Sequence, residues 1–380
     1  MTTADHEGAQ FMANEQHVFQ PDYSLSPGAF LEESLDSMGI SARELARRCG
    51  RSAKLISEIL SGKAPLEPET ALQLEKVTAV NATVWLNLEA EYRLHLARAQ
   101  EESQFANAFA WAREFPLREL EERGVLRPAK DKADSVRKLL EFFGVAGVDA
   151  CEAAFGSLSV SYRHSPSFQS DRKALFAWLR LGELEAESIV CKDYDRATFL
   201  QSLAKIRVLS LKNIETFLPQ IAQICAQAGV AFVVSRPLGK VALSGVSRWL
   251  SPRKAMIQQT MRHMSNDHFW FTFFHEAAHI LNHSRKTVFV DGKNLDGATP
   301  EQEEEANQWA TEFLIPAEDL SRFIKKGDFS ELAVKKFAGE QEIAPGIVVG
   351  QLQNKRHLNF GQLNQLKDRF EWYSGTPSQD

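Results

Sequence analysis

Apolar positions recur at helical spacing along the N-terminal part of the chain, in short runs separated by turn residues. The segment SARELARRCGRSAKLISEILSGK begins at Ser41, which forms a capping box with Glu44, and its first helix ends at Gly50. Ser52 can cap a second helix. The apolar stripe of that second helix consists of Leu55, Ile56, Ile59 and Leu60. Two short helices joined by a tight turn that contains glycine predict a helix-turn-helix.

The pattern changes in the second half of the chain. Helical periodicity gives way to the apolar run GVAFVV, which indicates a buried strand. We expect residues 254–262 to form an edge strand that aligns a peptide by β-augmentation. The C-terminal stretch IAPGIVVGQLQNKRHLNFGQLNQLKDRFEW is again helical, and we assign it a packing or interaction role rather than a second helix-turn-helix.

The apolar segment FWFTFFHEAAHILNH carries polar side chains that suit a metal site. His275 and His279 are one helical turn apart and can both point at one ion. Glu276 is placed to take a proton from a bound water as general base and to pass it to a leaving amine. A satisfied pair of core histidines is the alternative, but a buried helix rarely holds two histidines and a glutamate without a metal or a pairing partner.

A third histidine, His283, continues the same spacing. It lies about 12 Å from His275 along a straight helix, so three such side chains cannot surround one ion. The metzincin pattern HExxHxxGxxH, which breaks the helix at a glycine, is absent because Asn282 and Arg285 stand at the glycine and final histidine positions. We therefore place His283 at the helix C-terminus, where an imidazole suits the helix dipole.

A carboxylate from a second helix can complete the site. The helix PEQEEEANQWATEFL begins at Pro300 and has a lean apolar face formed by Ala306, Ala310, Phe313 and Leu314. Glu303 shares this face, whereas Glu304 and Glu305 are rotated off it by roughly 100 and 200 degrees. We predict that Glu303 is the third metal ligand. Asn307, one turn on, is expected to contact one of the two histidines.

Composition and net charge add limits rather than a function. The 380 residues exceed one ordinary core, so several domains are expected. The net charge of −6 gives no whole-chain sign of nucleic-acid binding. The four cysteines contain no CxxC pair, which is typical of reduced thiols in a cytoplasmic protein. No apolar run approaches the length of a membrane span, so we expect no membrane contact.

The predicted helix-turn-helix is basic although the chain is acidic overall. Residues 41–63 include six arginines and lysines against two glutamates. The residues expected to contact operator DNA are Arg51, Ser52, Lys54, Ser57 and Lys63. A small helical protein-binding domain with a solvated basic face is the alternative.

Two resemblances extend these interpretations. The segments SPGAFLEE, SGKAPLEPETALQLE and WLNLEAEYRLHLA resemble the HigA-type antitoxin branch of the XRE/Cro helix-turn-helix family. The resemblance implies a five-helix, lambda-repressor-like DNA-binding domain that usually dimerises on a palindromic operator, so a homodimer is expected. The sequence departs from the family at Cys49–Gly50–Arg51, where leucine, glycine and valine are more usual.

HEAAHILNH followed by EEEANQWATEFLIP resembles the ImmA/IrrE family of zinc metallopeptidases. That resemblance implies a compact gluzincin-like fold that binds Zn²⁺, with Glu303 as the glutamate of the family's ExxAN motif. Trp309 stands where phenylalanine is usual. The better-known members cleave repressors of the XRE type, and some carry the XRE domain in the same chain, which implies an XRE-family repressor or an antitoxin as the protein substrate.

We therefore expect a multidomain, mainly α protein with a small α+β part. It combines an all-α helix-turn-helix domain with a C-terminal gluzincin-like metallopeptidase domain. The expected divisions are a disordered leader at 1–22, the helix-turn-helix domain at 23–98, a helical connector at 99–190, the metallopeptidase domain at 191–320 and a C-terminal helical region at 321–380.

Two functions stay open. The chain is either a zinc endopeptidase that cleaves a repressor or antitoxin, or even itself, or a non-enzymatic, antitoxin-like repressor whose zincin domain senses a signal or partner. A metal-sensing repressor is a third hypothesis, but it needs an exposed site, and the apolar surroundings of the histidines disfavour one.

Overall fold

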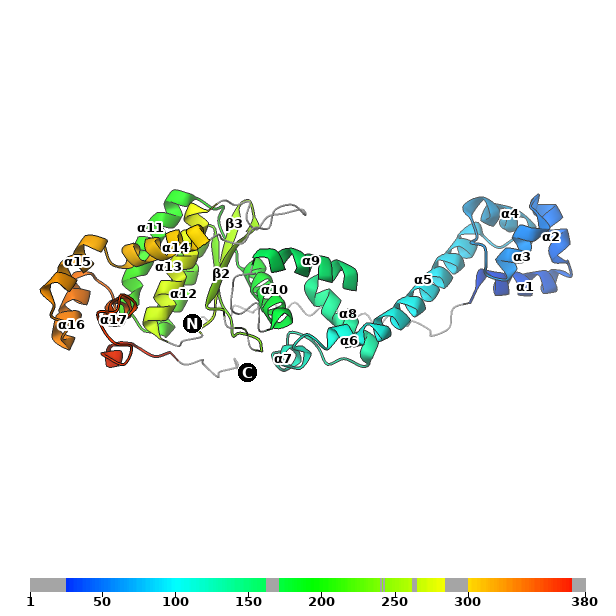
Figure 1. The fold of residues 1–380 in the computed structure, drawn as a ribbon. Coiled ribbons are helices and arrows are strands. Elements are labelled where there is room, and N and C mark those ends of the chain that lie inside the picture. Colours follow the sequence, from blue (N-terminus) through cyan, green and yellow to red (C-terminus); the bar gives the residue numbers. More distant parts are fainter. Residues whose placement is uncertain are drawn as a thin grey trace, which may run out of the picture. The chain divides into compact units, whose positions relative to one another are not determined.

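The computed structural model describes residues 25–161, 171–239, 241, 243–261, 265–283 and 300–370, so the predicted leader lies outside the described residues. The chain divides into two compact units, Met1–Ala106 and Asn107–Asp380 (Figure 1). Helices dominate both, and the described residues contain one three-stranded sheet. The expected class, mainly α with a small α+β part, is confirmed. None of the described helices is both long and apolar enough to span a lipid bilayer.

The N-terminal unit packs four short helices and the longer α5 around a small core. Its helices are α1 (Pro27–Met38), α2 (Ala42–Cys49), α3 (Ala53–Leu60), α4 (Pro68–Thr78) and α5 (Ala82–Asn107). Each contributes a fully buried apolar side chain, namely Leu31, Leu45, Ile56, Leu74 and Trp85. The predicted caps are present, since Ser41 Oγ accepts from the Glu44 N–H at 3.2 Å and Ser52 Oγ accepts from the Leu55 N–H at 3.1 Å. Gly50, in the left-handed conformation at φ 63°, ends α2 as predicted.

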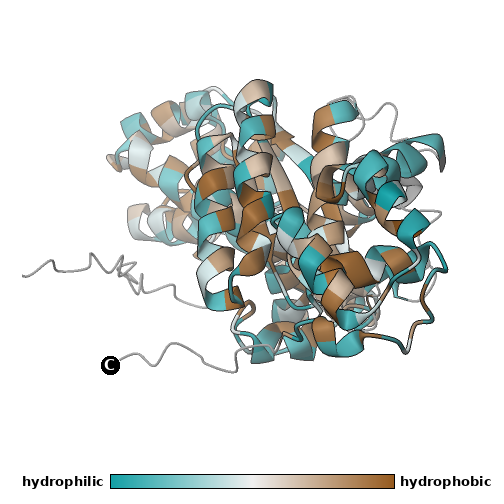
Figure 2. Ribbon diagram, turned by 90° about the vertical axis from the view of Figure 1, so that its left-hand side faces the viewer, coloured by the Kyte–Doolittle hydropathy of each residue, from teal (hydrophilic) through white to brown (hydrophobic). Residues whose placement is uncertain are grey.

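The C-terminal unit begins with helices and then forms its sheet. The first part holds α6 (Phe109–Ala112), α7 (Leu117–Glu122), α8 (Lys132–Phe143), α9 (Val148–Ser161), α10 (Arg172–Ser188), α11 (Arg196–Val208) and α12 (Ile214–Gln227). The strands are β1 (Val230–Val234), β2 (Gly245–Ser251) and β3 (Lys254–Gln259). The described residues after the sheet form the helices α13 (Asn266–Asn282), α14 (Pro300–Leu314), α15 (Ala317–Lys326), α16 (Glu331–Glu340) and α17 (Pro345–Asn354). Most helices carry apolar residues on one part of their surface and polar residues on the rest, as the brown and teal bands in Figure 2 show.

The sheet has the strand order β1-β3-β2, with β1 and β3 parallel and β2 and β3 antiparallel. The run GVAFVV forms β1, which confirms the predicted buried strand. The expectation of an edge strand at residues 254–262 was wrong, because Lys254–Gln259 form the central strand; Arg262 lies outside the described residues. Within this central strand the polar side chains of Gln258 and Gln259 are fully buried. Their amide nitrogens donate to the carbonyls of Trp178 and Phe269, at 2.7 and 2.8 Å, which provides each buried amide with an acceptor for its N–H group.

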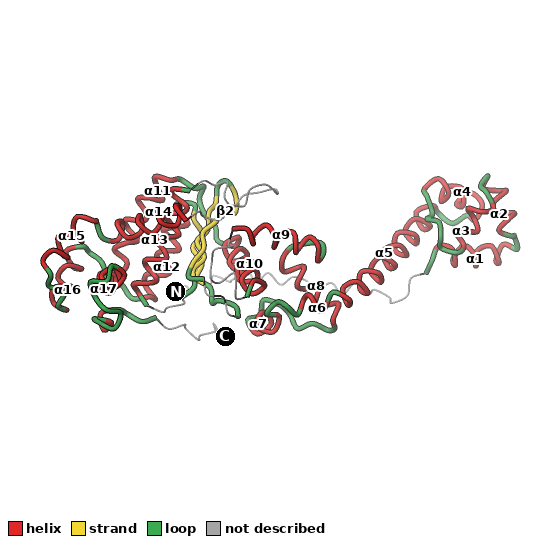
Figure 3. The backbone as a smooth tube through the Cα atoms, viewed as in Figure 1, coloured by secondary structure: helices red, strands yellow, loops and turns green. Residues whose placement is uncertain are grey.

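Helices cover both faces of this sheet (Figure 3). Val230, Phe232 and Ile257 point into the large core shared with α11 to α14. Ala231 and Met256, the alternate positions, instead pack in a smaller cluster with residues of α10. Because α10 closes the second face, this helix of the predicted connector is part of the same compact unit as the sheet. The sequence-based domain limits stay predictions.

The C-terminal segment supports the start of α13. The Asn266 N–H donates to the Asp368 carbonyl at 3.0 Å, and the Asn266 side chain donates to the Asp368 carboxylate at 2.9 Å. Lys367 Nζ pairs at 2.6 Å with Asp267, whose side chain is 7% exposed. The helix α17 packs along α13. The described part of the tail therefore packs against α13, as predicted. The expectation that the whole stretch is helical was wrong, because after α17 only the 3-10 turn Asn364–Leu366 is helical among the described residues.

Candidate metal centre

Two neighbouring helices, α13 and α14, bring the predicted metal ligands together. The helix α13 is buried nearly all round, and aromatic side chains on several of its faces hold it in the core. On α14, Ala306 and Ala310 are fully buried, and their small side chains allow the two helices to approach closely. As a result, His275 and His279 on α13 face Glu303 on α14.

The ring nitrogens and carboxylate oxygens of these three residues have spacings close to those around one tetrahedral ion. His275 Nε2 lies 3.3 Å from Glu303 Oε2, His279 Nε2 lies 3.5 Å from Glu303 Oε1, and the two Nε2 atoms are 3.1 Å apart. Ligand atoms about 2.0–2.2 Å from a tetrahedral zinc ion stand about 3.3–3.6 Å from one another. Two imidazoles with one carboxylate are also a donor set that zinc prefers in catalytic sites, where a fourth position stays open. The residues present therefore fit a zinc ion.

The electrostatics at this point favour a cation. Burial alone lowers the pKa of His275, but the hydrogen bond to Glu303 and the charge of Glu276 raise it above its usual value. Burial, together with the neighbouring His275, lowers the pKa of His279 to about 4, so that ring is neutral, as a metal ligand must be. Burial also acts to raise the pKa of Glu303, but the hydrogen bond to His275 and the charge of His279 bring it below its usual range. A metal ion would replace the proton that the carboxylates hold on His275.

Glu276 lies beside the ligands, with a side chain that is 7% exposed. Burial raises its pKa to about 7, although His275 and hydrogen bonds with Ser247 of β2 oppose this rise. The strand can come this close because Gly245 has no side chain. A Cβ at that position would lie only 2.7 Å from Thr272 Cγ2 and 3.0 Å from Glu276 Cγ. Sequence reasoning missed the role of Ser247, because the contact depends on where β2 crosses α13.

The structure also shows how Asn307 and His283 are placed. Asn307 makes a side-chain hydrogen bond that favours the protonated form of His275, so it lies next to a ligand as expected. His283 caps the C-terminal end of α13, where it was predicted. The sequence did not predict its contacts. The ring of His283 lies between His279 and Glu305. Glu305 was expected to point off the metal-binding face, and that same rotation brings it to His283.

The residues predicted to contact DNA all lie in the N-terminal unit. Lys54, Ser57 and Lys63 are exposed. Arg51 is partly buried, and its Nε donates to Gln73 of α4 at 2.6 Å. The Ser52 hydroxyl caps α3. Part of the hydrogen-bonding capacity of Arg51 and Ser52 is therefore used within the fold, which leaves the two lysines as the cleaner test of a DNA contact.

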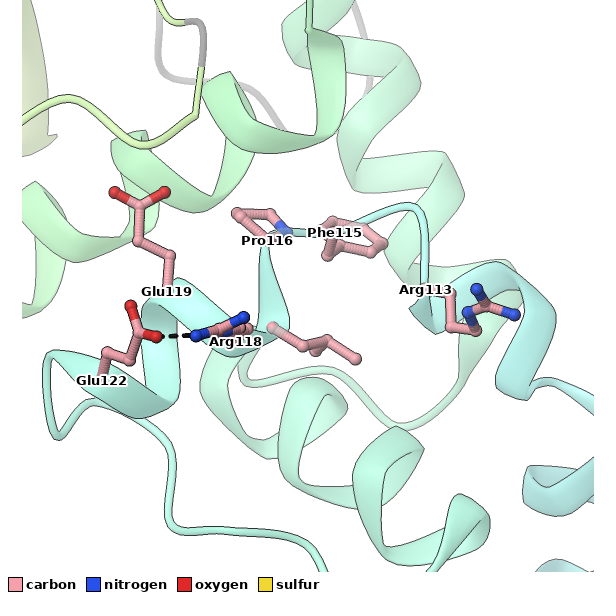
Figure 4. A pocket seen from close by; sticks show the side chains of 7 residues that line it. Arg113, Phe115, Pro116, Arg118, Glu119 and Glu122 are labelled. Atoms are coloured by element: carbon pink, nitrogen blue, oxygen red, sulfur yellow. Dashed lines mark hydrogen bonds and ion pairs between the residues drawn. The ribbon is translucent and has the colours of Figure 1, made fainter.

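A separate hollow in the C-terminal unit is drawn in Figure 4. It has a volume of about 500 Å³ and is lined by Arg113, Phe115, Pro116, Leu117, Arg118, Glu119 and Glu122. Arg118 and Glu122 pair with each other at 2.8 Å, and Glu119 accepts from the Gly239 N–H at 2.8 Å. Since these charged groups are engaged within the fold, we base no function on this hollow.

Comparisons with known proteins cover both units. Residues 233–340 match the family profile Peptidase_M78, the IrrE N-terminal-like domain, and this span includes His275, Glu276, His279 and Glu303. The N-terminal part is 40% identical over 68 residues to the uncharacterized HTH-type transcriptional regulator YddM of Escherichia coli K12, which is 18% of this chain and 72% of that protein. It is also 35% identical over 81 residues to virulence-associated protein I of Dichelobacter nodosus, 21% of this chain and 75% of that protein. The chain thus belongs to the HTH-type transcriptional regulators through its N-terminal part, and it carries an IrrE N-terminal-like, metallopeptidase-type domain at residues 233–340.

Proposed function

We propose that this transcriptional regulator is a zinc-dependent endopeptidase that cleaves an XRE-family repressor or an antitoxin in the cytoplasm. The observation that carries the proposal is the convergence of His275, His279 and Glu303, with the buried carboxyl of Glu276 beside them. A pure binding module has no chemical need for that carboxyl, because it is not among the three converging ligands.

The chain's own residues supply the binding and the proton transfer. His275, His279 and Glu303 would hold a zinc ion, which would polarise a carbonyl and lower the pKa of a water to about 7. As a water attacks the carbonyl carbon of the scissile peptide and the C–N bond breaks, Glu276 would accept a proton from the water and deliver it to the departing amide nitrogen. The pKa of about 7 that burial gives Glu276 suits both steps near neutral pH.

The edge strand β2 is the natural guide for a peptide. It pairs with β3 on one side, and among the described residues no strand pairs with its other side. Ser247 of β2 contacts Glu276, so a peptide lying along this strand would carry its backbone past the general base. We therefore propose that β2, rather than residues 254–262, aligns the peptide by β-augmentation.

In this proposal, the N-terminal unit binds operator DNA and so brings the peptidase to the operator. Its exposed lysines and arginines suit the phosphates of operator DNA, and a homodimer would place two such units on a palindromic site. The peptidase would thereby act where its repressor substrate is bound.

The test compares wild type with Glu276→Gln in cells that also express candidate XRE-family repressors from the same locus. We expect a repressor fragment with wild type, zinc-dependent and abolished by a chelator, and none with the variant. If both proteins regulate equally and no fragment forms at any zinc concentration, the chain is the non-enzymatic regulator instead.

A further inference from the structure

The ring of His279 has neighbours at both nitrogens. Its Nε2 faces His275 and Glu303, as described above. Its Nδ1 lies 2.8 Å from the Nδ1 of His283, and the His283 N–H donates to the His279 carbonyl at 3.1 Å. In contrast, Nδ1 of His275 is buried and has no hydrogen-bond partner among the described residues. The two ligand histidines are thus held in different ways.

The short distance between the two Nδ1 atoms requires one donor and one acceptor. If His279 Nε2 directs its lone pair at a metal, the proton of that neutral ring is on Nδ1 and is donated to His283. His283 then accepts at Nδ1 and carries its own proton on Nε2. That nitrogen lies 3.4 Å from Glu305 Oε2, where a carboxylate can accept. One set of tautomers satisfies the whole chain of contacts.

The burial along this chain of contacts is graded. The side chain of His283 is 9% exposed and that of Glu305 is 57% exposed. The contact between the rings is therefore shielded from water, whereas the outer contact is partly screened. We expect the loss of the His283 acceptor to matter more than the loss of the Glu305 carboxylate.

We propose that His283 and Glu305 are positioning residues that hold His279 in the Nδ1–H tautomer and thereby raise the affinity of the site for zinc without binding the ion. The inference rests on the proposed zinc site. It accounts for a third histidine that continues the spacing of the first two although it lies beyond the reach of the ion.

The test measures the zinc dissociation constant of the full-length protein by competition with a chromogenic chelator. His283→Leu removes the acceptor at similar size, and we expect zinc to bind about 10–100-fold more weakly. His283→Asn places Oδ1 near the position of Nδ1 and keeps an acceptor, so its affinity should stay within about threefold of wild type. Both variants should still bind one zinc ion at saturation. Equal affinity in His283→Leu and wild type, or equal weakening in both variants, overturns the proposal.

The outer contact has a matched control on the same helix. Glu305→Ala and Glu304→Ala each remove one exposed carboxylate, but only Glu305 contacts His283 among the described residues. We expect zinc to bind about threefold more weakly to Glu305→Ala than to Glu304→Ala. Because both side chains are exposed, folding should be intact, and equal affinities overturn the role of Glu305.

Two further measurements distinguish a positioning role of His283 from a structural role and from direct ligation of zinc. A merely structural role would lower the melting temperature of metal-free His283→Leu and leave zinc affinity unchanged, which is the opposite of our expectation. If His283→Leu binds no zinc even at saturation, His283 is itself a ligand and the proposal fails. If wild type and Glu303→Ala bind zinc equally, the proposed zinc site is wrong. If zinc affinity falls in Glu303→Ala but not in His283→Leu, the zinc site stands and only the positioning role of His283 is wrong.

Discussion

The lysines predicted to contact DNA in the N-terminal unit are exposed, whereas Glu276 and the two histidines of the candidate metal centre in the C-terminal unit are largely buried. The Lys54 side chain is 84% exposed and its nearest carboxylate, that of Glu58, is 3.8 Å away. Glu276 is 7% exposed and its pKa is raised to about 7. Exposed charges act together and each contributes little, while a buried group alters the chemistry by itself. The size of a mutational effect should therefore separate the two units.

The largest effect is expected at the general base. Replacing Glu276 by Gln keeps the shape but removes proton transfer, so kcat/KM for a cleaved repressor should fall by at least about 100-fold. Zinc content, measured by atomic absorption, should be unchanged because Glu276 is not among the converging ligands. Activity close to wild type in this variant would show that the buried carboxyl does not take part in the reaction.

The next effect is the loss of a ligand. Glu303→Ala leaves two imidazoles, and zinc affinity should weaken by more than about 100-fold, since even groups that only support ligands cost 10–100-fold. Glu304→Ala is the control, with the same charge change one position along the helix. Matching zinc affinities in the two variants would contradict the choice of Glu303.

A smaller, distributed effect is expected for DNA. The double variant Lys54→Ala with Lys63→Ala should weaken operator binding at every sequence tested. The negative slope of log affinity against log salt should become less negative by about two. Lys76→Ala on α4 is a matched exposed control outside the predicted set. An unchanged salt slope in the double variant would remove both lysines from the interface.

Ser52 tests whether a predicted DNA residue acts through the fold. Because its hydroxyl caps α3, Ser52→Ala should destabilise the N-terminal unit by about 1 kcal/mol. Ser57→Ala, an exposed change on the same helix, should be close to neutral. Hydrogen exchange of peptides from Met1–Ala106 measures both, and equal protection in the two variants would argue against the cap.

The smallest effect concerns Glu44, a partly exposed carboxylate on α2. Hydrogen bonds from Arg47 and Arg48 lower its pKa from 4.5 to about 2. The folded state thus binds the proton less readily, so its contribution is present above pH 4.5 and is lost as the pH falls towards 2. Between pH 5 and pH 3, protection of α2 against hydrogen exchange should drop more in wild type than in Glu44→Gln. A larger drop in the variant would contradict this sign.

Local chemistry made part of the structure predictable. Ser41 and Ser52 cap the helices they were expected to cap, and the apolar run GVAFVV forms a buried strand, because each signal depends on near neighbours in sequence. Helix phase alone placed Glu303 on the face that meets the histidines. The assignment of a ligand role to Glu303 stays a prediction, but its position follows from one helix turn.

Contacts between distant segments were not predictable in the same way. Gln258 is a polar residue that is buried because its side-chain amide donates to the carbonyl of Trp178, eighty positions earlier in the chain. The link between His283 and Glu305 depends on how α13 and α14 are aligned, and neither helix alone determines that. The position of Ser247 beside Glu276 likewise depends on the path of β2. Interhelical and strand-to-helix registers are tertiary properties, and residue spacing does not encode them directly.

The ion pair between Lys367 and Asp267 affects where a recombinant fragment of the metallopeptidase-type domain should end. The family match ends at residue 340, yet the first turn of α13 is fastened by residues 367 and 368. A recombinant fragment that stops at 340 would leave Asp267 buried without its cation and would expose the apolar face against which α17 packs. We therefore expect a stable fragment to extend beyond the matched span, and a truncation series should reach residue 370.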